Sequence, residues 1–241
     1  MPYEVHPSCQ TPEDRSLKIW RYMDFTKFVA MLENKAIFFP NISSLPDPFE
    51  GFYTTPTVER FRGITEGIEP EEAARRREVG EHNLAMMKQG RNLLYVSAWH
   101  INEFESAAMW ELYLKSGEGV AIQSTVTNMI VSFNNTFDRV YIGEIEYVDY
   151  EHYEIDSGNI FSPAMHKRKS YEHEKELRAL ILNAENVSGK LVSTDLNVLI
   201  DRVYVAPNSK RWYYELVKKT VIRYGLDKEV INSILDQTPL Y

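Results

Sequence analysis

Alternating apolar and polar positions along the chain predict strands and helices in mixed order. Residues 17–22 alternate with a period of two, and a similar alternation over 139–148, rich in β-branched and aromatic residues, is the clearest strand signal. After Asp24, a candidate N-cap, apolar residues follow the i, i+3, i+4, i+7 spacing of an amphipathic helix. We predict further strands over 36–39, 93–98, 119–124, 176–182 and 202–207, and further helices over 69–90, 104–116, 208–224 and from Asp227 onward.

Two segments lack this periodicity. Residues 1–15 are polar, contain three prolines and are predicted to form a flexible, poorly anchored N-terminal segment. Residues 41–56, with three more prolines and one glycine, are predicted to be a loop. Since residues 16–241 contain no internal repeat and no linker rich in Gly or Ser, we predict a single α+β domain there. Its sheet should be mixed or antiparallel and flanked by helices, and the two C-terminal helices should pack on it through Val217, Val221, Ile231 and Ile234.

Composition narrows the class of protein. A hydrophobic fraction of 44% over 241 residues is enough for a real core and excludes a largely disordered chain. The 35 Asp and Glu against 27 Lys and Arg give a net charge of −8, which argues against a uniformly basic nucleic-acid-binding protein. No apolar run approaches the roughly 18 residues of a membrane span, and the N-terminus lacks a signal-peptide pattern. We therefore expect a cytoplasmic protein with no membrane association.

Most standard motifs of catalysis and metal binding are absent. The chain contains no GxGxxG, no GxxxxGK[ST], no HExxH and no GxSxG, so none of the corresponding chemistries has a sequence signal. The single cysteine, Cys9, excludes an intramolecular disulfide and a Cys-based zinc site. The six histidines never stand three or four residues apart, so no helical metal pair is offered. We expect no metal site.

Two clusters combine a polar side chain with aromatic residues. Arg21 stands between two aromatic residues on the first strand, and the cluster Ser97-Ala98-Trp99-His100 lies at the end of the strand predicted over 93–98. Arg21 can pair with one of the many acids, and Trp99, Trp110 and Tyr113 can be core rather than a platform for a ligand. The aromatic residues concerned are Trp20, Tyr22, Trp99, Trp110 and Tyr113.

A third cluster carries alternating charges. If residues 173–181 form a strand, Glu174, Glu176 and Arg178 point to one face while the residues between them point into the core. Such a row is costly to desolvate unless it is paired or faces a cleft. The alternative is a helix in which Glu174 and Arg178 form an ordinary surface pair. Periodicity alone does not decide between the two.

Taken together, these motifs resemble the bacterial domain of unknown function numbered 2971, over roughly residues 17–206. The loop 45–51 and the segment 174–178 are its most specific elements, and Pro46 stands where the family usually carries Asn. The resemblance supplies a family but no established activity. The motifs concerned are Trp20-Arg21-Tyr22, Leu45-Pro46-Asp47-Pro48-Phe49-Glu50-Gly51, Ser97, Met109-Trp110-Glu111-Leu112-Tyr113, Gly119-Val120-Ala121-Ile122, Tyr147, and Lys169, Tyr171 and Glu174-Lys175-Glu176-Leu177-Arg178.

A second resemblance suggests a chemistry. The order of Arg on an early strand, Ser on a middle strand and Glu-x-Glu on a late strand is similar to the Arg-Ser-Glu pattern of ADP-ribosyltransferases. It implies that NAD is a substrate, that Arg21 holds one of its phosphates and that Ser97 orients the ribose on the nicotinamide side. It also implies that Glu176 stabilises a ribosyl cation and that Glu174 positions the acceptor. A stacking surface for nicotinamide would come from Tyr22, Trp99 or Tyr113.

These inferences give a concrete expectation for the site. Glu174, Glu176 and Arg178 should face a cleft shared with Arg21, Tyr22, Ser97, Trp99, Trp110 and Tyr113, and the basic run 167–169 should attract a phosphate-bearing ligand. The loop 44–51 should be ordered near Arg21, with Asp47 or Glu50 contacting an arginine. In such an open cleft, Glu176→Gln would leave the melting temperature nearly unchanged.

Two other functions compete with an NAD-using transferase or glycohydrolase. One is a non-catalytic module that binds a ligand or a protein, in which the aromatic and acidic loop 41–56 makes the contact. The other is a metal-dependent nuclease starting from Asp47 and Glu50, which would need an acid-x-Lys pair on a following strand. No such pair lies at a sensible distance. The enzyme and the binding module are distinguished by whether Arg21, Ser97 and Glu176 surround one cleft.

Overall fold

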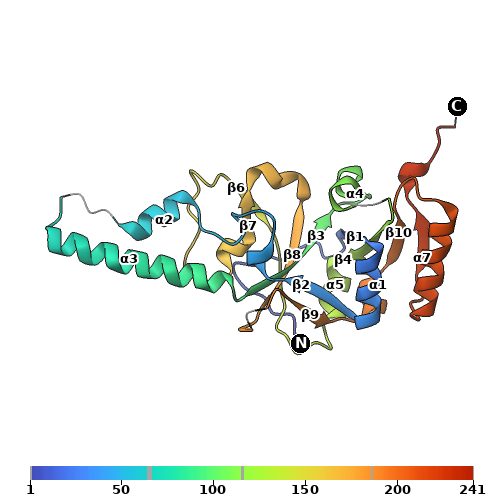
Figure 1. Cartoon of the computed structure of the whole chain (residues 1–241), viewed down its shortest axis with the longest axis horizontal. Coiled ribbons are helices and arrows are strands. Elements are labelled where there is room, and N and C mark those ends of the chain that lie inside the picture. Colours follow the sequence, from blue (N-terminus) through green and yellow to red (C-terminus); the bar gives the residue numbers. More distant parts are fainter. Residues whose placement is uncertain (1, 64–66, 115–116, 186, 241) are drawn as a thin grey trace.

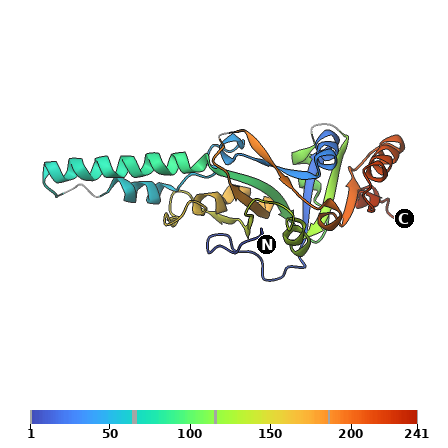
Figure 2. The ribbon, with the colours of Figure 1, turned by 90° about the horizontal axis from the view of Figure 1, so that it is seen from below.

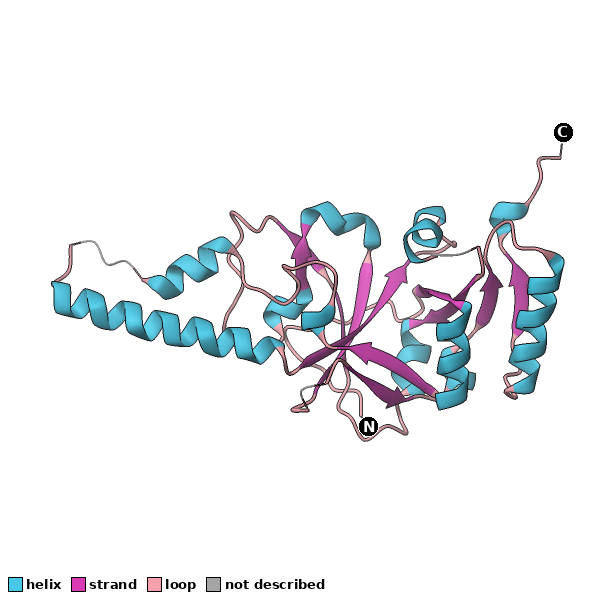
Figure 3. Cartoon of the chain, viewed as in Figure 1, coloured by secondary structure: helices cyan, strands magenta, loops and turns pink. Residues whose placement is uncertain are grey.

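The computed structural model describes the whole chain apart from residues 1, 64–66, 115–116, 186 and 241 (Figure 1). Its centre is a seven-stranded sheet in the order β11-β10-β4-β1-β3-β8-β5. Neighbouring strands are antiparallel except for β10 and β11, which are parallel. The predicted single-domain α+β fold with a mixed sheet and flanking helices is therefore confirmed (Figure 3). The sheet strands are β1 (Lys18–Asp24), β3 (Leu94–Ile101), β4 (Gly119–Thr125), β5 (Tyr141–Glu144), β8 (Glu176–Leu182), β10 (Arg202–Val205) and β11 (Glu229–Asn232).

Two short ribbons and the helices complete the fold. The ribbons are β2 (Ala36–Pro40) with β9 (Gly189–Ser193) and β6 (Glu146–Val148) with β7 (His166–Arg168). The α-helices are α1 (Phe25–Asn34), α2 (Thr55–Arg62), α3 (Pro70–Arg91), α4 (Ala107–Tyr113), α5 (Val126–Ser132), α6 (Leu196–Leu199) and α7 (Arg211–Arg223). The 3₁₀ helices are η1 (Ile42–Ser44), η2 (Ser162–Met165), η3 (Lys169–Glu174) and η4 (Ile234–Asp236). Among the helices in the described part of the chain, none combines the length and apolar character that a membrane span needs.

The central sheet is split along one of its strand boundaries. β1 pairs with β4 over its whole length, from Lys18 to Asp24. It pairs with β3 at only two positions, Ile19 with Ile101 and Trp20 with His100. Beyond Trp20 the pairing stops, so the strands β11-β10-β4-β1 and β3-β8-β5 form two half-sheets that are joined at one end. Side chains from β1 can therefore enter the gap between the halves.

Each face of the sheet has its own core. The largest core lies on the face covered by α1, α5, α7 and the ribbon β2–β9, and it includes Ile19, Trp99 and Leu177. The opposite face carries two smaller cores. One holds Trp20, Tyr22 and Trp110 under α4, and the other holds Val96 and Leu180 beside η2. Because side chains alternate along a strand, each residue of β1, β3 and β8 belongs to one of these two faces.

A helical arm extends away from this body (Figures 1 and 2). Its long helix α3 begins at Pro70 with acids in the first turn, as predicted, and ends one residue beyond the predicted Gly90. Its partner α2 begins in the last two residues of the predicted loop 41–56, and it was not predicted. Gly80 lies against the backbone of Phe61, where a Cβ would come within 2.1 Å of a carbonyl oxygen. This close approach holds the two helices together.

Most of the predicted elements are present with small shifts. Strong alternation or helical spacing correctly predicts β1, α1, β2, α3, β3, β4, β8, β10 and α7. The strand predicted over 139–148 is two strands, β5 and β6, separated by Ile145. The helix predicted over 104–116 is shorter and begins at Ala107, and its expected end at residues 115–116 lies outside the described residues. The elements α2, α5, α6 and β9, all short, were not predicted.

The predicted C-terminal helix from Asp227 is wrong. Residues 229–232 form β11, parallel to β10, and a single 3₁₀ turn follows. The β-branched pair Val230 and Ile231 suits a strand, and β10 offers an unpaired edge next to it. Val217 and Val221 of α7 pack into the main core as predicted, whereas Ile231 lies at the margin of the smaller core on the opposite face and Ile234 is exposed.

The N-terminal segment is held more firmly than its composition predicted. The Glu4 amide donates to the Val140 carbonyl over 3.0 Å, and the Glu144 amide donates to the Gln10 carbonyl over 3.0 Å. Cys9 is buried between them, and a Cβ on Gly143 would come within 2.7 Å of the Cys9 backbone. The segment therefore lies along β5, and Gly143 allows its close approach.

This contact gives a first testable prediction. Gly143→Ala should force the segment around Cys9 away from β5, at a cost of about 1–3 kcal/mol, because the added methyl meets backbone rather than a movable side chain. Urea unfolding measures the cost, and reaction of the Cys9 thiol with a disulfide reagent measures its exposure. Gly117→Ala, where the added methyl meets open space, is the control. Unchanged stability together with an unreactive thiol in Gly143→Ala would contradict the prediction.

Candidate functional site

The charged residues predicted to line a cleft are instead the centre of a buried ion network. β8 is a strand, so the alternative of a surface helix over this segment is wrong. Glu174 is nevertheless not part of it, because it ends the 3₁₀ helix η3, and Lys175 adopts a left-handed conformation before β8 begins. Glu176 and Arg178 point to the same face, as the alternation predicted.

Arg178 is the most buried member of this network, with a side chain only 1% exposed. Its Nε donates to Glu176 Oε1 over 2.6 Å. Its Nη1 donates to Glu50 Oε2 over 3.1 Å and to the carbonyl of Ala164 over 2.6 Å, and Nη2 donates to Glu50 Oε1 over 3.4 Å. The guanidinium is thus bound by two carboxylates and one carbonyl, as a buried cation requires.

Lys167 joins the same carboxylates from β7 of the short ribbon β6–β7. Its Nζ lies 3.1 Å from Glu50 Oε1, 2.6 Å from Glu174 Oε2 and 3.4 Å from Glu176 Oε2. We call Glu50, Lys167, Glu174, Glu176 and Arg178 the buried ion network. All but Glu174 are buried, and Glu174 is only slightly exposed. The charged row is therefore sealed and paired, and the expected open cleft at Glu176 and Arg178 is not found.

The opposite charges within the network stabilise the charged forms of its side chains. Burial by itself would raise the pKa of Glu50, but Arg178 and Lys167 outweigh it and hold that pKa below its ordinary value. Burial would likewise lower the pKa of Arg178, and the carboxylates of Glu176 and Glu50 raise it instead. The pKa of Lys167 is raised for the same reason. All three side chains are therefore charged at neutral pH.

The loop 44–51 is ordered by these contacts, as predicted, but its arginine partners are not Arg21. Glu50 reaches Arg178, while Asp47 Oδ1 lies 2.8 Å from Arg168 Nη2. The Arg168 guanidinium also lies over the ring of Phe49, 4.3 Å from its centroid. The loop thus lies against β7 and β8, on the far half-sheet from Arg21.

Arg21 and Ser97 do come together, on the other face of the sheet. Arg21 Nη1 donates to Ser97 Oγ, and Nη2 donates to the carbonyl of Phe38 over 3.2 Å. The guanidinium lies 5.7 Å from the ring centroid of Trp99. Ser97 pairs with Ala179 of β8, so it faces away from Glu176. The expected cleft containing Arg21, Ser97 and Glu176 together is therefore wrong.

Arg21 differs from the other inward-pointing cations in lacking a carboxylate. It is half-buried, and within the described residues no ion pair includes it. Burial lowers its pKa to about 10, and the phenol of Tyr113 acts in the opposite direction. Tyr113 belongs to α4 on the opposite face, so the two groups influence each other across the gap between β1 and β3.

The predicted aromatic residues divide between core and surface. Tyr22, Trp99 and Trp110 are buried, and Tyr22 and Trp110 meet edge to face with centroids 4.9 Å apart. The interpretation of Trp99 and Trp110 as core is correct, whereas Tyr113, to which the same interpretation applied, is not part of the core. Tyr113 is 44% exposed. Burial raises its pKa to about 12, and Glu174 and Glu176 add to the rise.

Two residues at these sites were not predicted to lie there: Lys167 in the ion network and Phe38 beside Arg21. Lys167 appeared only as part of a basic run, although it is the second cation of the network. Its neighbours in the sequence are also basic, so no periodic signal separates it from them. Phe38 is 48% exposed in the middle of an otherwise apolar strand, where alternation could have placed it outside.

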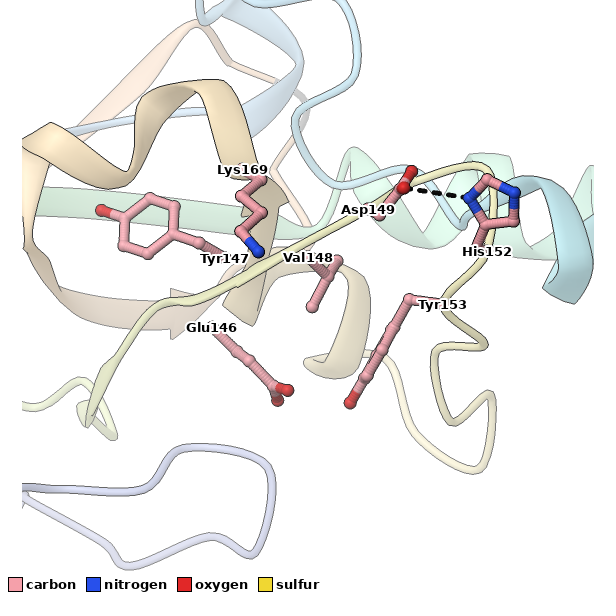
Figure 4. Close-up of a pocket in the computed structure, with 7 residues that line it drawn as sticks. All are labelled: Glu146, Tyr147, Val148, Asp149, His152, Tyr153 and Lys169. Carbon is pink, nitrogen blue, oxygen red and sulfur yellow. Dashed lines mark hydrogen bonds and ion pairs between the residues drawn. The ribbon is translucent and has the colours of Figure 1, made fainter.

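A surface pocket of about 330 Å³ lies elsewhere, beside β6 (Figure 4). Its lining is mixed in charge, with Asp149 bound to His152 over 2.9 Å, and of the basic run 167–169 it includes only Lys169. The hydroxyl of one lining residue, Tyr147, accepts from the Glu176 amide over 2.8 Å, which connects this pocket to β8. In the part of the chain that the structure describes, no cluster of His, Cys, Asp and Glu is arranged to hold a metal ion. The pocket is lined by Glu146, Tyr147, Val148, Asp149, His152, Tyr153 and Lys169.

Comparison of this chain with family models, with curated proteins and with solved structures gives no match. The resemblances to the bacterial domain of unknown function and to ADP-ribosyltransferases accordingly stay predictions from the sequence.

Because Glu176 belongs to the buried ion network, Glu176→Gln should lower the stability of the fold instead of leaving the melting temperature nearly unchanged. Gln cannot accept from Arg178 and Lys167 with both of its side-chain polar atoms, so an N–H group would face a buried cation. We predict a loss of about 3 kcal/mol of stability in urea unfolding, the scale of a broken buried ion pair. Glu172→Gln, two residues before Glu174 on the exposed side of η3, is the control and should change stability by less than about 0.5 kcal/mol. If Glu176→Gln were as stable as Glu172→Gln, the conclusion that Glu176 is part of a buried ion network would be contradicted.

Acid should weaken the network through Glu50. Its pKa in the folded protein lies below the ordinary value of 4.5, so the unfolded chain takes up a proton first as the pH falls. The stability that Glu50 contributes is present above pH 4.5 and is lost as the pH falls through its folded pKa. Urea unfolding of the wild type and of Glu50→Gln from pH 7 to acid should show a difference that shrinks below about pH 4.5. A difference that is constant or grows would contradict the charged state assigned to Glu50.

Proposed function

We propose that this protein binds a phosphate-bearing small molecule at Arg21. The observation that carries the proposal is a half-buried guanidinium with no carboxylate partner among the described residues, in a chain whose other inward cations, Arg178, Lys167 and Arg168, are each paired. A buried charge that is left unpaired is costly, and an anionic ligand would remove that cost. Guanidinium groups bind phosphate with two parallel hydrogen bonds.

The surroundings of Arg21 support a ligand that also carries a ring. Its two hydrogen bonds to Ser97 and Phe38 use two of the five N–H donors of the guanidinium. The Phe38 carbonyl accepts from Arg21, and the phenol of Tyr113 acts electrostatically on Arg21 from the opposite face of the sheet. The ring of Tyr113 is partly exposed, which suits it to stacking on a base or a nicotinamide. NAD and its fragments are therefore the first ligands to test.

Glu176 does not support the transferase chemistry that the Arg-Ser-Glu order suggested. Its carboxylate is already bound to Arg178 and Lys167, and it faces away from Ser97. A developing ribosyl cation needs a carboxylate that is free to approach it. The geometry thus favours the ligand-binding module over the enzyme.

One observation keeps NAD turnover as a second candidate. The phenol of Tyr113 responds electrostatically both to Arg21 and to Glu174. Glu174 has a single cationic partner, Lys167, and a slightly exposed side chain. Among the acids of the network, Glu174 is therefore the one to test for an NAD-consuming reaction.

Thermal unfolding with inorganic pyrophosphate, ADP-ribose and NAD tests the binding proposal. A ligand at about 100 times its Kd should stabilise the wild type by about 2.7 kcal/mol. Arg21→Gln should abolish that shift, while its stability without ligand changes by less than about 1 kcal/mol, because an unpaired charge is lost together with its hydrogen bonds. Arg202→Gln, an exposed arginine on β10, is the control and should keep the shift.

Two results would contradict binding at Arg21. One is the absence of a shift with all three ligands, and the other is an equal shift in Arg21→Gln. For the second candidate, NAD hydrolysis is measured on the wild type, Glu174→Gln and the control Glu172→Gln. Hydrolysis that Glu174→Gln alone abolishes would support an enzyme, and binding without hydrolysis would leave the module.

A further inference from the structure

The outer face of α7 differs in charge from the rest of the molecule. Residues 210–223 contain five Lys and Arg against one Glu. The rest of the chain then has 22 Lys and Arg against 34 Asp and Glu, so a basic helix lies on a strongly acidic body. All five cations are exposed, and within the described residues none of them takes part in an ion pair. They are Lys210, Arg211, Lys218, Lys219 and Arg223.

The stability of the helix does not explain this charge. Cations near a helix C-terminus are favourable, which accounts for Arg223. Lys210 and Arg211 lie at the N-terminal end, where the helix macrodipole disfavours positive charge, and no acid stands in the first turn. The N-terminal cations therefore cost stability, and a role outside the fold accounts for them better.

The same face exposes large apolar side chains. Trp212 is 54% exposed and Ile222 is 67% exposed, and Leu216 lies one turn after Trp212. The spacing of a helix places Trp212 and Leu216 in the row that continues to Lys219 and Arg223. Apolar groups thus occupy the first half of this row and cations the second half.

The helix presents this face rigidly and without cover. Tyr213, Val217 and Val221 on its inner side are buried in the main core, which fixes its orientation. Figures 1 and 2 both show α7 at the end of the molecule opposite the helical arm, with no other element outside it. A partner can therefore reach its whole length.

We propose that the outer face of α7 is a docking surface for an acidic segment of another protein that also carries apolar side chains. Carboxylates on that segment would meet Lys218, Lys219 and Arg223, and its apolar residues would cover Trp212 and Leu216. Nucleic acid fits less well, because Leu216 and Ile222 find no counterpart on a phosphate backbone. The acidic body would also repel a long polyanion.

Binding of labelled peptides to the full chain tests the surface. The probe is an acidic peptide of about 15 residues, which spans the helix, with Glu and Asp interleaved with Leu and Phe. A second peptide replaces Leu and Phe with Ser at the same charge. Fluorescence anisotropy should show binding of the first peptide that is at least about tenfold tighter than that of the second.

Two variants of α7 should each weaken that binding by about tenfold or more: Lys219→Glu with Arg223→Glu, and Trp212→Ala with Leu216→Ala. The side chains concerned are exposed, so thermal unfolding should confirm that the fold is kept. The matched control reverses two exposed cations of the arm, Arg75→Glu with Lys88→Glu, and should bind as the wild type does.

Four results would overturn the proposal. They are no binding of the acidic apolar peptide, equal binding of the Ser peptide, equal binding to the α7 variants, and preference for another anionic surface. The last is measured with a single-stranded oligothymidylate and with vesicles containing phosphatidylserine. Binding of either one that depends on α7, without binding of the peptide, would assign this face to nucleic acid or lipid.

Discussion

The burial of Arg178 is the constraint on which the arrangement of β8, the loop 44–51 and η2 depends. A guanidinium in the middle of a central strand is tolerated only when its charge and its N–H groups are met on all sides, and one strand cannot supply that. Glu176 comes from the same strand, Glu50 from the loop after η1, and the carbonyl of Ala164 from η2. The loop 44–51 and the turn of chain before β7 are therefore both bound to one side chain.

The same constraint separates Glu176 from Arg21, which were predicted to line one cleft. Because Glu176 neutralises Arg178 and Lys167, it is not free to serve a ligand at Arg21. The split between β1 and β3 then leaves Arg21 at the junction of the half-sheets, held by Ser97 and Phe38 but without a counter-charge among the described residues. Of these two arginines, Arg178 is thus structural, and Arg21 is the centre of the proposed anion site.

Sequence patterns predicted where strands and helices lie better than they predicted which side chains share a face of the sheet. Alternation was enough for β1, β3 and β8, and it correctly placed Glu176 and Arg178 on one side of a strand. Whether Arg21 shares that side depends on two pairings between strands, Trp20 with His100 and His100 with Glu176. The register between strands that are distant in the sequence cannot be predicted from local periodicity. The prediction of a C-terminal helix was wrong for a related reason, because residues 229–232 form a strand that pairs with the free edge of β10. Lys167 was hidden in a run of basic residues, because charge alone does not reveal which member is buried.

A double-mutant cycle on Glu50 and Arg178 tests the central claim most directly. Urea unfolding of Glu50→Gln, Arg178→Met and the double variant gives the coupling free energy between the two side chains. If the network organises β8, the loop 44–51 and η2, the double variant loses less stability than the two single variants together, by about 1–3 kcal/mol, because each single variant leaves the other charge buried without its partner. Losses that add to within about 0.5 kcal/mol would contradict the claim and would make Arg178 an independent part of the core.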